Sequence, residues 1–206
     1  DLLMAKGNPH EAAAHYKKSY QLAKNGFVAI SWAKALRSEG KRSDTYLPLT
    51  DWLKIKPGDD SVRLFYATVL RNDGKLPDAI EHFQYLLKKS PDNSIVLNEL
   101  AITYHLAKDP RALETAETAY KLNPAPAIAD TLATMLLELK QDRRALELLK
   151  KAVATGTRNP EIRYHYALAL SRTGQINKAK QELKNILESG RPFPQQAEAR
   201  QLLKQQ

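Results

Sequence analysis

Apolar residues recur with the period of an α-helix along most of the chain, and short polar segments interrupt them at regular intervals. In "LRNDGKLPDAIEHFQYLLKKSP", from Leu70 to Pro91, Gly74 stops one helical pattern and Ile80 and Phe83 belong to the next. The whole pattern predicts helices joined by tight turns, at residues 9–24, 27–39, 42–55, 60–73, 76–89, 94–107, 110–121, 126–139, 142–155, 160–173 and 176–188.

A turn residue recurs at an almost constant spacing. It stands at Gly7, Gly40, Gly74, Lys108, Lys140 and Gly174, with spacings of 33, 34, 34, 32 and 34 residues. Self-similarity at about 34 residues is typical of proteins built from repeated helix–turn–helix units. The stretch from Leu70 to Pro91 is therefore the second half of one repeated unit, and not an isolated hairpin.

Small residues occupy fixed places around each turn. They stand on first helices at Ala33, Ala67, Ala101, Ala133 and Ala167, and on second helices at Ala12, Thr45, Ala79, Ala112, Ala145 and Ala179. Small side chains at a crossing let two helix axes approach at the short end of about 8–10 Å. A third small position is expected to touch the next unit, at Ser19, Ala119 and Ala152. Trp52 and Leu86 break that rule, and we expect the hairpin around Trp52 and Thr45 to be splayed or shifted.

This pattern resembles the tetratricopeptide repeat (TPR) over nearly the whole chain. The resemblance implies an all-α fold, a right-handed α-α superhelix (TPR solenoid) of about five full repeats with a partial repeat before them. The repeats are expected at residues 1–25 (partial, with a truncated first helix), 26–59, 60–93, 94–125 (with a shortened turn), 126–159 and 160–191. A C-terminal capping helix is expected at 192–206, where Ala199, Leu202 and Leu203 form one apolar stripe after Pro192 and Pro194.

Two sequence features bear on how far the natural protein extends and where it works. Leu2, Leu3 and Met4 read as a helix without its first half, so we expect a fragment or processed form with more repeats upstream. Past Ile95, "DPRALE" and "NPEIRYHYALAL" resemble the C-terminal repeats of the PEP-CTERM system TPR lipoproteins (PrsT-like), over residues 94–203. That resemblance implies a bacterial envelope protein facing the periplasm, lipid-anchored upstream. The same pieces occur in other bacterial TPR proteins, so a cytoplasmic location stays open.

Catalytic chemistry is not indicated by any motif. The sequence has no cysteine, which excludes disulfides, thiolate zinc sites and a cysteine nucleophile within it. It contains no glycine-rich phosphate loop, no H-E-x-x-H and no G-x-S-x-G. Glu161 and His165 share a helix face one turn apart, which is compatible with a metal contact or with a plain polar contact. We predict no catalytic residue, no metal, no cofactor and no enzyme activity.

The TPR resemblance implies that the first helices line an inner groove where the family binds peptides. It places the groove positions at Lys34, Arg37, Arg71, Asn72, Asn98, His105, Asp130, Thr134, Glu138, Tyr164 and Arg172. The clamp that some TPR domains use for a C-terminal carboxylate is incomplete, because Ile30, Ser31 and Ser61 stand where polar or basic residues are needed. Asn98 and Asp130 are expected either to bind a peptide backbone or to hydrogen-bond each other.

Charge leaves more than one function open. The net charge is +9, which favours anionic partners, although lysines late in helices also complement helix dipoles. The first hypothesis is a protein-interaction scaffold that holds a partner peptide or segment in the groove. The second is binding of nucleic acid, another polyanion or a polysaccharide through the basic surface, against which the core positions of most aromatic residues argue. The third is a structural role with self-association, and the oligomeric state is left open. No apolar run of about 18 residues is present, so a membrane contact would need the lipid anchor.

Overall fold

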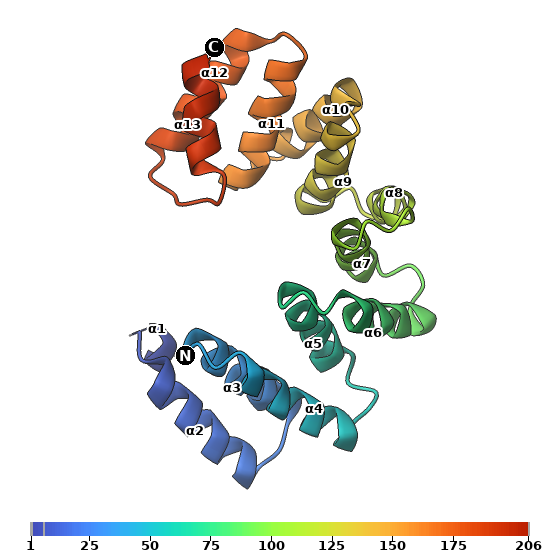
Figure 1. Ribbon diagram of the computed structural model, residues 1–206, viewed down its shortest axis with the longest axis vertical. Coiled ribbons are helices and arrows are strands. Elements are labelled where there is room, and N and C mark those ends of the chain that lie inside the picture. The colour runs from blue at the N-terminus through green and yellow to red at the C-terminus, as the bar shows by residue number, and fades with distance from the viewer. Residues whose placement is uncertain (1, 6, 206) are drawn as a thin grey trace. The chain divides into compact units, whose positions relative to one another are not determined.

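The computed structural model describes residues 2–5 and 7–205, which form thirteen α-helices, one short 3-10 helix and no strand (Figure 1). This confirms the all-α fold. The contacts divide the chain into two compact units, Asp1–Pro91 (unit 1) and Asp92–Gln206 (unit 2). The division falls close to the expected boundary between the repeats 60–93 and 94–125. The end residues of the expected segments 1–25 and 192–206 lie outside the described residues, and so does residue 6.

The helices follow one another in the order that the apolar pattern predicts. Unit 1 contains α1 (Leu2–Ala5), α2 (Pro9–Leu22), α3 (Gly26–Ser38), the 3-10 helix η1 (Ser43–Thr45), α4 (Tyr46–Ile55), α5 (Asp60–Asn72) and α6 (Leu76–Lys89). Unit 2 contains α7 (Ser94–Leu106), α8 (Ala112–Leu122), α9 (Pro126–Glu138), α10 (Asp142–Ala154), α11 (Pro160–Arg172), α12 (Ile176–Glu188) and α13 (Gln196–Gln205). Each helix of the described residues is too short or too polar to span a lipid bilayer.

All six predicted turn residues adopt the left-handed backbone conformation. Their φ angles are positive, at Gly7 (72°), Gly40 (87°), Gly74 (76°), Lys108 (56°), Lys140 (57°) and Gly174 (81°). The residue after the turn donates its N–H back into the helix, as from Gln141 to the carbonyl of Leu136 at 2.8 Å. Glycine adopts this conformation freely, whereas a side chain with a Cβ is strained there. The two lysines therefore hold strain that the glycines avoid.

Replacing Lys140 with glycine should stabilise unit 2. Removing the strain gains roughly 1–2 kcal/mol, and the added freedom of the unfolded chain costs about 0.5–1 kcal/mol, so the net gain should lie between about 0 and 1.5 kcal/mol. Urea unfolding of Lys140→Gly measures it. Lys150→Gly, inside α10, is the control and should lose about 1 kcal/mol. A loss of stability in Lys140→Gly would contradict the strain argument.

Most of the predicted small positions are buried, as expected. The five alanines on the first helices, together with Thr45, Ala79, Ala145 and Ala179 on second helices, have no exposed surface, and Ala12, Ala112, Ala119 and Ala152 are buried. Ser19 is exposed, so its predicted contact role is wrong. The adjacent Tyr20 is buried instead, with its ring 5.7 Å from that of Trp32. The larger aromatic side chain takes over the packing at the end of α2.

The hairpin around Trp52 is irregular. The single helix predicted at 42–55 is wrong, because η1 ends at Thr45 and α4 begins at Tyr46. Pro48 has no N–H with which to continue a regular helix from the preceding turn. Trp52 donates its indole N–H to Asp59 Oδ2 at 2.8 Å, beside Gly26 at the start of α3. The predicted splaying of this hairpin stays a prediction.

Adding a methyl group at Gly26 should destabilise unit 1. A Cβ there would lie 2.6 Å from Asp59 Oδ2 and 2.9 Å from Trp52 Nε1, closer than such atoms pack. Gly26→Ala should therefore cost about 1–3 kcal/mol in chemical unfolding, as overpacked sites do. The control is Gly58→Ala, where nothing lies within 4 Å of the new Cβ. Equal stability of the two variants would show that Trp52 can move aside.

The capping helix at the end of the chain is confirmed. Leu202 and Leu203 of α13 pack against a buried cluster that includes Leu183, Phe193 and Ala199. Phe193 lies between the two prolines, and its burial was not anticipated from the sequence. Its ring fixes the turn that leads into α13, so the prolines and the phenylalanine together direct the last helix back onto α12.

Candidate functional site

The predicted binding residues lie on the first helices of the repeats. Unit 1 presents them on α3 and α5, and unit 2 presents them on α7, α9 and α11. We call the surface of α7, α9 and α11 that carries these positions the first-helix face of unit 2.

Side-chain contacts link neighbouring first helices of unit 2. His105 Nε2 of α7 lies 3.2 Å from Glu138 Oε1 of α9. His165 Nδ1 of α11 lies 2.7 Å from Asp130 Oδ1 of α9, and both of these side chains are largely buried. The contacts hold polar groups of three successive first helices, α7, α9 and α11, in fixed positions. His165 was not among the predicted binding positions, and its contact with Asp130 replaces the predicted contact with Glu161.

Arg172 is fixed by the repeat that precedes its own. Its Nη1 donates to the backbone carbonyl of Leu137 at 2.7 Å and lies 3.5 Å from Asp142 Oδ1. This carbonyl also accepts the backbone N–H of Lys140 at 3.2 Å, so the arginine adds a further bond at the C-terminal end of α9. Arg172 therefore has a structural partner in addition to the binding role predicted for it.

Asn98 is the residue of the face whose hydrogen bonding is incomplete. Its side chain is 8% exposed, and its Oδ1 has no hydrogen-bond partner within residues 2–5 and 7–205. In the described part of the chain, no hydrogen bond joins Asn98 to Asp130, so of the two alternatives the mutual bond is not formed. Asp130 pairs with His165 instead, because His165 projects from the next first helix toward it. The Oδ1 atom of Asn98 is therefore a buried acceptor that makes no hydrogen bond within the described residues.

Two other predicted positions on this face are occupied within the fold. Thr134 donates its hydroxyl to the carbonyl of Asp130 at 2.9 Å, within its own helix. Tyr164 is buried against Phe193, with ring centroids 6.3 Å apart, and this burial raises the pKa of its phenol. Tyr164 is thus part of the core under α13, while Glu138 is exposed.

In unit 1, Arg37 takes part in a structural cluster. Its Nη1 lies 2.9 Å from Asp73 Oδ2, which also accepts the hydroxyl of Tyr46 at 2.7 Å. The Arg37 hydrogen bond is the main reason that the pKa of Asp73 is lowered. Burial, followed by the bond to Asp73, raises the pKa of Tyr46 to about 12. The cluster ties α3 and α4 to the end of α5.

The other three predicted positions of unit 1 differ in exposure. Lys34 is exposed, with its Nζ 5.5 Å from the centre of the Phe65 ring. Asn72 is exposed at the last residue of α5, and Arg71 beside it is half-buried. The binding roles predicted for these residues stay predictions.

The Asp73 cluster should make unit 1 sensitive to acid. A carboxylate whose pKa is lowered by folding contributes stability above its unfolded pKa of about 3.9, and this is lost as the pH falls through the folded value. Asp73→Asn should lower stability at neutral pH by about 1–3 kcal/mol and flatten its dependence on pH below about 4. Urea unfolding of unit 1 across this pH range measures both. An unchanged pH profile would show that Asp73 titrates alike in both states. Asp92→Asn, an exposed carboxyl in unit 2, is the control.

The face offers hydrogen bonding rather than metal coordination. Among the described residues, no three His, Asp or Glu side chains lie close enough to hold a metal ion together. The arrangement can align the backbone of a bound segment, because carboxylate, amide and imidazole groups stand one repeat apart.

Comparison with known proteins identifies the repeat. Two models of the tetratricopeptide repeat match residues 67–125 and 136–205. A thermophilic TPR protein, TTC0263 of Thermus thermophilus, has a similar structure, with a TM-score of 0.72 and 19% identity over 87% of this chain and 99% of its own. A TPR protein from Parabacteroides merdae has a TM-score of 0.72 and 13% identity, over 93% of this chain and 77% of its own. The structure of Pseudomonas aeruginosa pilF has a TM-score of 0.69 and 18% identity, over 96% of this chain and 89% of its own. The TM-scores show a shared fold, and at these low sequence identities the likeness shows the fold alone. No curated protein sequence matches the chain.

Proposed function

Since the chain carries tetratricopeptide repeats, we propose that it is a non-enzymatic scaffold that binds an extended segment of a partner protein on the first-helix face of unit 2. TPR proteins bind protein partners, and helical repeats present long surfaces suited to that task.

The observation that carries the proposal is the unpaired Oδ1 of Asn98. A buried polar atom without a partner costs about 1–3 kcal/mol, so folds rarely keep one without a use. The backbone N–H of an extended peptide is a donor that needs no particular side chain. Because Oδ1 is itself buried, the amide of Asn98 turns toward the surface of α7 when it accepts such a bond.

The neighbours of Asn98 support the same use. Ile95 lies one turn earlier on α7 and is 60% exposed, which provides an apolar contact beside the acceptor. Asp130, one repeat further on, is held by His165 and continues the row of acceptors. An extended segment could therefore make backbone bonds to two repeats and place a side chain on Ile95.

Asn98→Leu separates binding from stability. Removing an idle buried acceptor should leave the melting temperature unchanged or raise it, because no existing bond to Oδ1 is lost. The same change should reduce capture of the partner at least roughly tenfold, as the loss of about 1.4 kcal/mol would. Quantitative pull-down from bacterial extracts, with thermal unfolding of each bait, measures both effects. The control is Asn177→Leu, an exposed residue of α12.

The outcomes have distinct meanings. Equal capture by the native chain, Asn98→Leu and Asn177→Leu would remove the first-helix face from the function. A marked fall in the melting temperature of Asn98→Leu would show that Asn98 has a structural role. Recovery of only salt-sensitive polyanions would move the function to the basic surface. That surface includes Lys140, Arg143 and Arg144, which line a hollow of ≈ 540 Å³.

We also propose that the chain works in the bacterial envelope, in a PEP-CTERM sorting and exopolysaccharide system, with a periplasmic location. The support is the sequence resemblance of residues 94–203 to the lipoproteins of that system. Separate pull-downs from envelope and cytosolic extracts address it. A partner found in the cytosolic extract alone would favour the cytoplasmic alternative.

A further inference from the structure

Unit 1 has a second surface with binding character, on the side of the second helices. Between α2 and α4 lie two hollows of ≈ 260 and ≈ 360 Å³. Both are lined by Trp32 of α3 and Leu47 of α4. We call the two hollows together the Trp32 slot. It lies outside the predicted binding positions, all of which are on first helices.

The apolar part of the slot is accessible. Leu47 is 59% exposed, and Trp32 is half-buried. The indole N–H of Trp32 has no acceptor among the described residues, whereas that of Trp52 is bonded to Asp59. A tryptophan N–H usually finds a partner when it is buried. Trp32 therefore offers both a ring and a free donor.

The next repeat shows why the slot is open. Tyr66 of α5 occupies the position equivalent to Trp32, and its ring meets Tyr46 of α4 at 6.0 Å and His82 of α6 at 5.0 Å. Side chains from both second helices cover the aromatic residue there. Around Trp32, Tyr20 of α2 contributes a ring on one side only, at 5.7 Å. On the opposite side of the slot stand η1 and the start of α4, where the side chain of Leu47 is exposed and does not cover Trp32.

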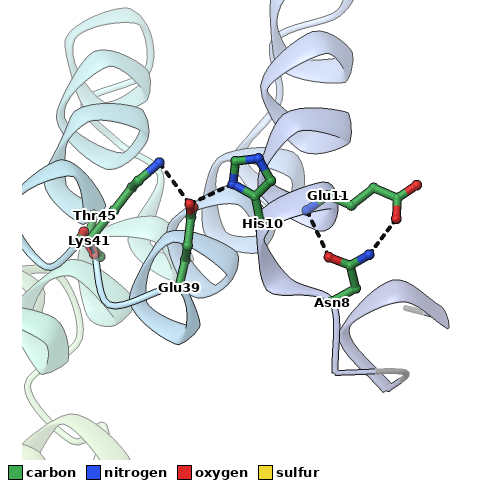
Figure 2. Close-up of polar contacts among 6 residues, drawn as sticks. All are labelled: Asn8, His10, Glu11, Glu39, Lys41 and Thr45. Carbon is green, nitrogen blue, oxygen red and sulfur yellow. Dashed lines mark hydrogen bonds and ion pairs between the residues drawn. The ribbon is translucent and has the colours of Figure 1, made fainter.

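A polar cluster closes one end of the slot. Figure 2 shows Glu39 between His10 and Lys41, with Glu39 Oε1 at 2.7 Å from His10 Nδ1 and 2.8 Å from Lys41 Nζ. The hydrogen bond from Lys41, followed by that from His10, lowers the pKa of Glu39. This carboxylate is already fully engaged and leaves little for a ligand cation.

The other end is closed in the same way. Asp51 Oδ2 accepts the hydroxyl of Tyr20 at 3.0 Å and the ammonium of Lys24 at 2.7 Å. Lys24 is the main cause of the lowered pKa of Asp51, and the field of Lys54 adds to it. Both ends therefore present carboxylates that cations of the chain itself have neutralised.

The two hollows are lined by more lysines than carboxylates. The lysines are Lys17, Lys24, Lys41 and Lys54, and the carboxylates are Glu39, Asp44 and Asp51. After the pairs of Glu39 with Lys41 and of Asp51 with Lys24, the charged groups left in the slot are two lysines and one carboxylate, that of Asp44, so the surplus charge is positive. Among the described residues, Lys17 has no ion pair or hydrogen bond, and it stands on α2 beside the hollow that Trp32 and Leu47 line. A ligand that complements this surface must bring an apolar group together with an anionic acceptor.

We propose that the Trp32 slot binds a segment of a partner protein in which a large apolar side chain stands next to a carboxylate. The apolar side chain packs against the indole of Trp32 and against Leu47. The carboxylate pairs with Lys17, and the segment supplies an acceptor for the indole N–H. A second copy of this chain complements the slot less well, because the chain carries a net charge of +9.

Titration of the whole chain with a defined peptide tests the proposal. The probe is a synthetic peptide, acetylated and amidated, in which Leu and Phe alternate with Asp and Glu. Tryptophan fluorescence should change on binding, because the ring of Trp32 becomes covered. Lys17→Ala and Leu47→Ala should each weaken binding roughly fivefold to tenfold, as expected for losing a charge-assisted bond or a buried apolar group. Both residues are exposed, so these variants should fold.

Matched controls make the result specific. Lys18→Ala removes another exposed lysine next to Lys17, and Ile55→Ala removes an exposed apolar side chain of α4. Neither residue lines the slot, so both variants should bind the acidic peptide like the native chain. A peptide with Asn and Gln in place of the acids should bind at least roughly fivefold more weakly.

Several results would overturn the assignment. Equal weakening by Lys17→Ala and Lys18→Ala would indicate general charge attraction. Binding that survives both slot variants but is lost in Asn98→Leu would place the peptide on the first-helix face. Dimers of the chain that Leu47→Ala disperses would make a second copy the occupant. Failure of this test leaves the proposed function of the first-helix face intact, because the two surfaces share no residue.

Discussion

The fold depends on the close approach of helices at crossings where both side chains are small. Ala67 on α5 and Ala79 on α6 are both fully buried, and the same pairing recurs along the chain. A larger side chain at such a crossing would force the helices apart, because packed interiors have little free volume. The alanines thus set the distance at which the aromatic and aliphatic residues around them can interlock.

The repeated features of the sequence predict the fold well, because every repeat meets the same requirement. The turn residues show this most clearly, since lysine at positions 108 and 140 adopts the conformation that glycine adopts elsewhere. Features that depend on one local compensation are harder to predict. Trp52 fits only because Gly26 leaves room for it. Tyr20 replaces Ser19 in the contact with the next repeat, where it packs against Trp32. Phe193 is buried in a cluster to which α11, α12 and α13 all contribute.

The candidate site is less predictable than the fold. Position in the repeat places a residue on the correct helix, but its exposure and partners depend on the helices one repeat away. Arg37 is held by Asp73, and Tyr164 is covered through Phe193. His165 lies one residue from a predicted position, and its contact with Asp130 spans 35 residues of sequence. Spacing within one helix carries no signal for such a contact.

The contact between His165 and Asp130 has a consequence for how selectively this face can bind. A carboxylate oxygen can accept two hydrogen bonds, so a ligand donor that reaches Asp130 Oδ1 shares this oxygen with the imidazole and does not replace it. The imidazole blocks one side of the oxygen and leaves the other side open. The α9 helix would therefore discriminate between ligands by the direction from which their N–H groups approach.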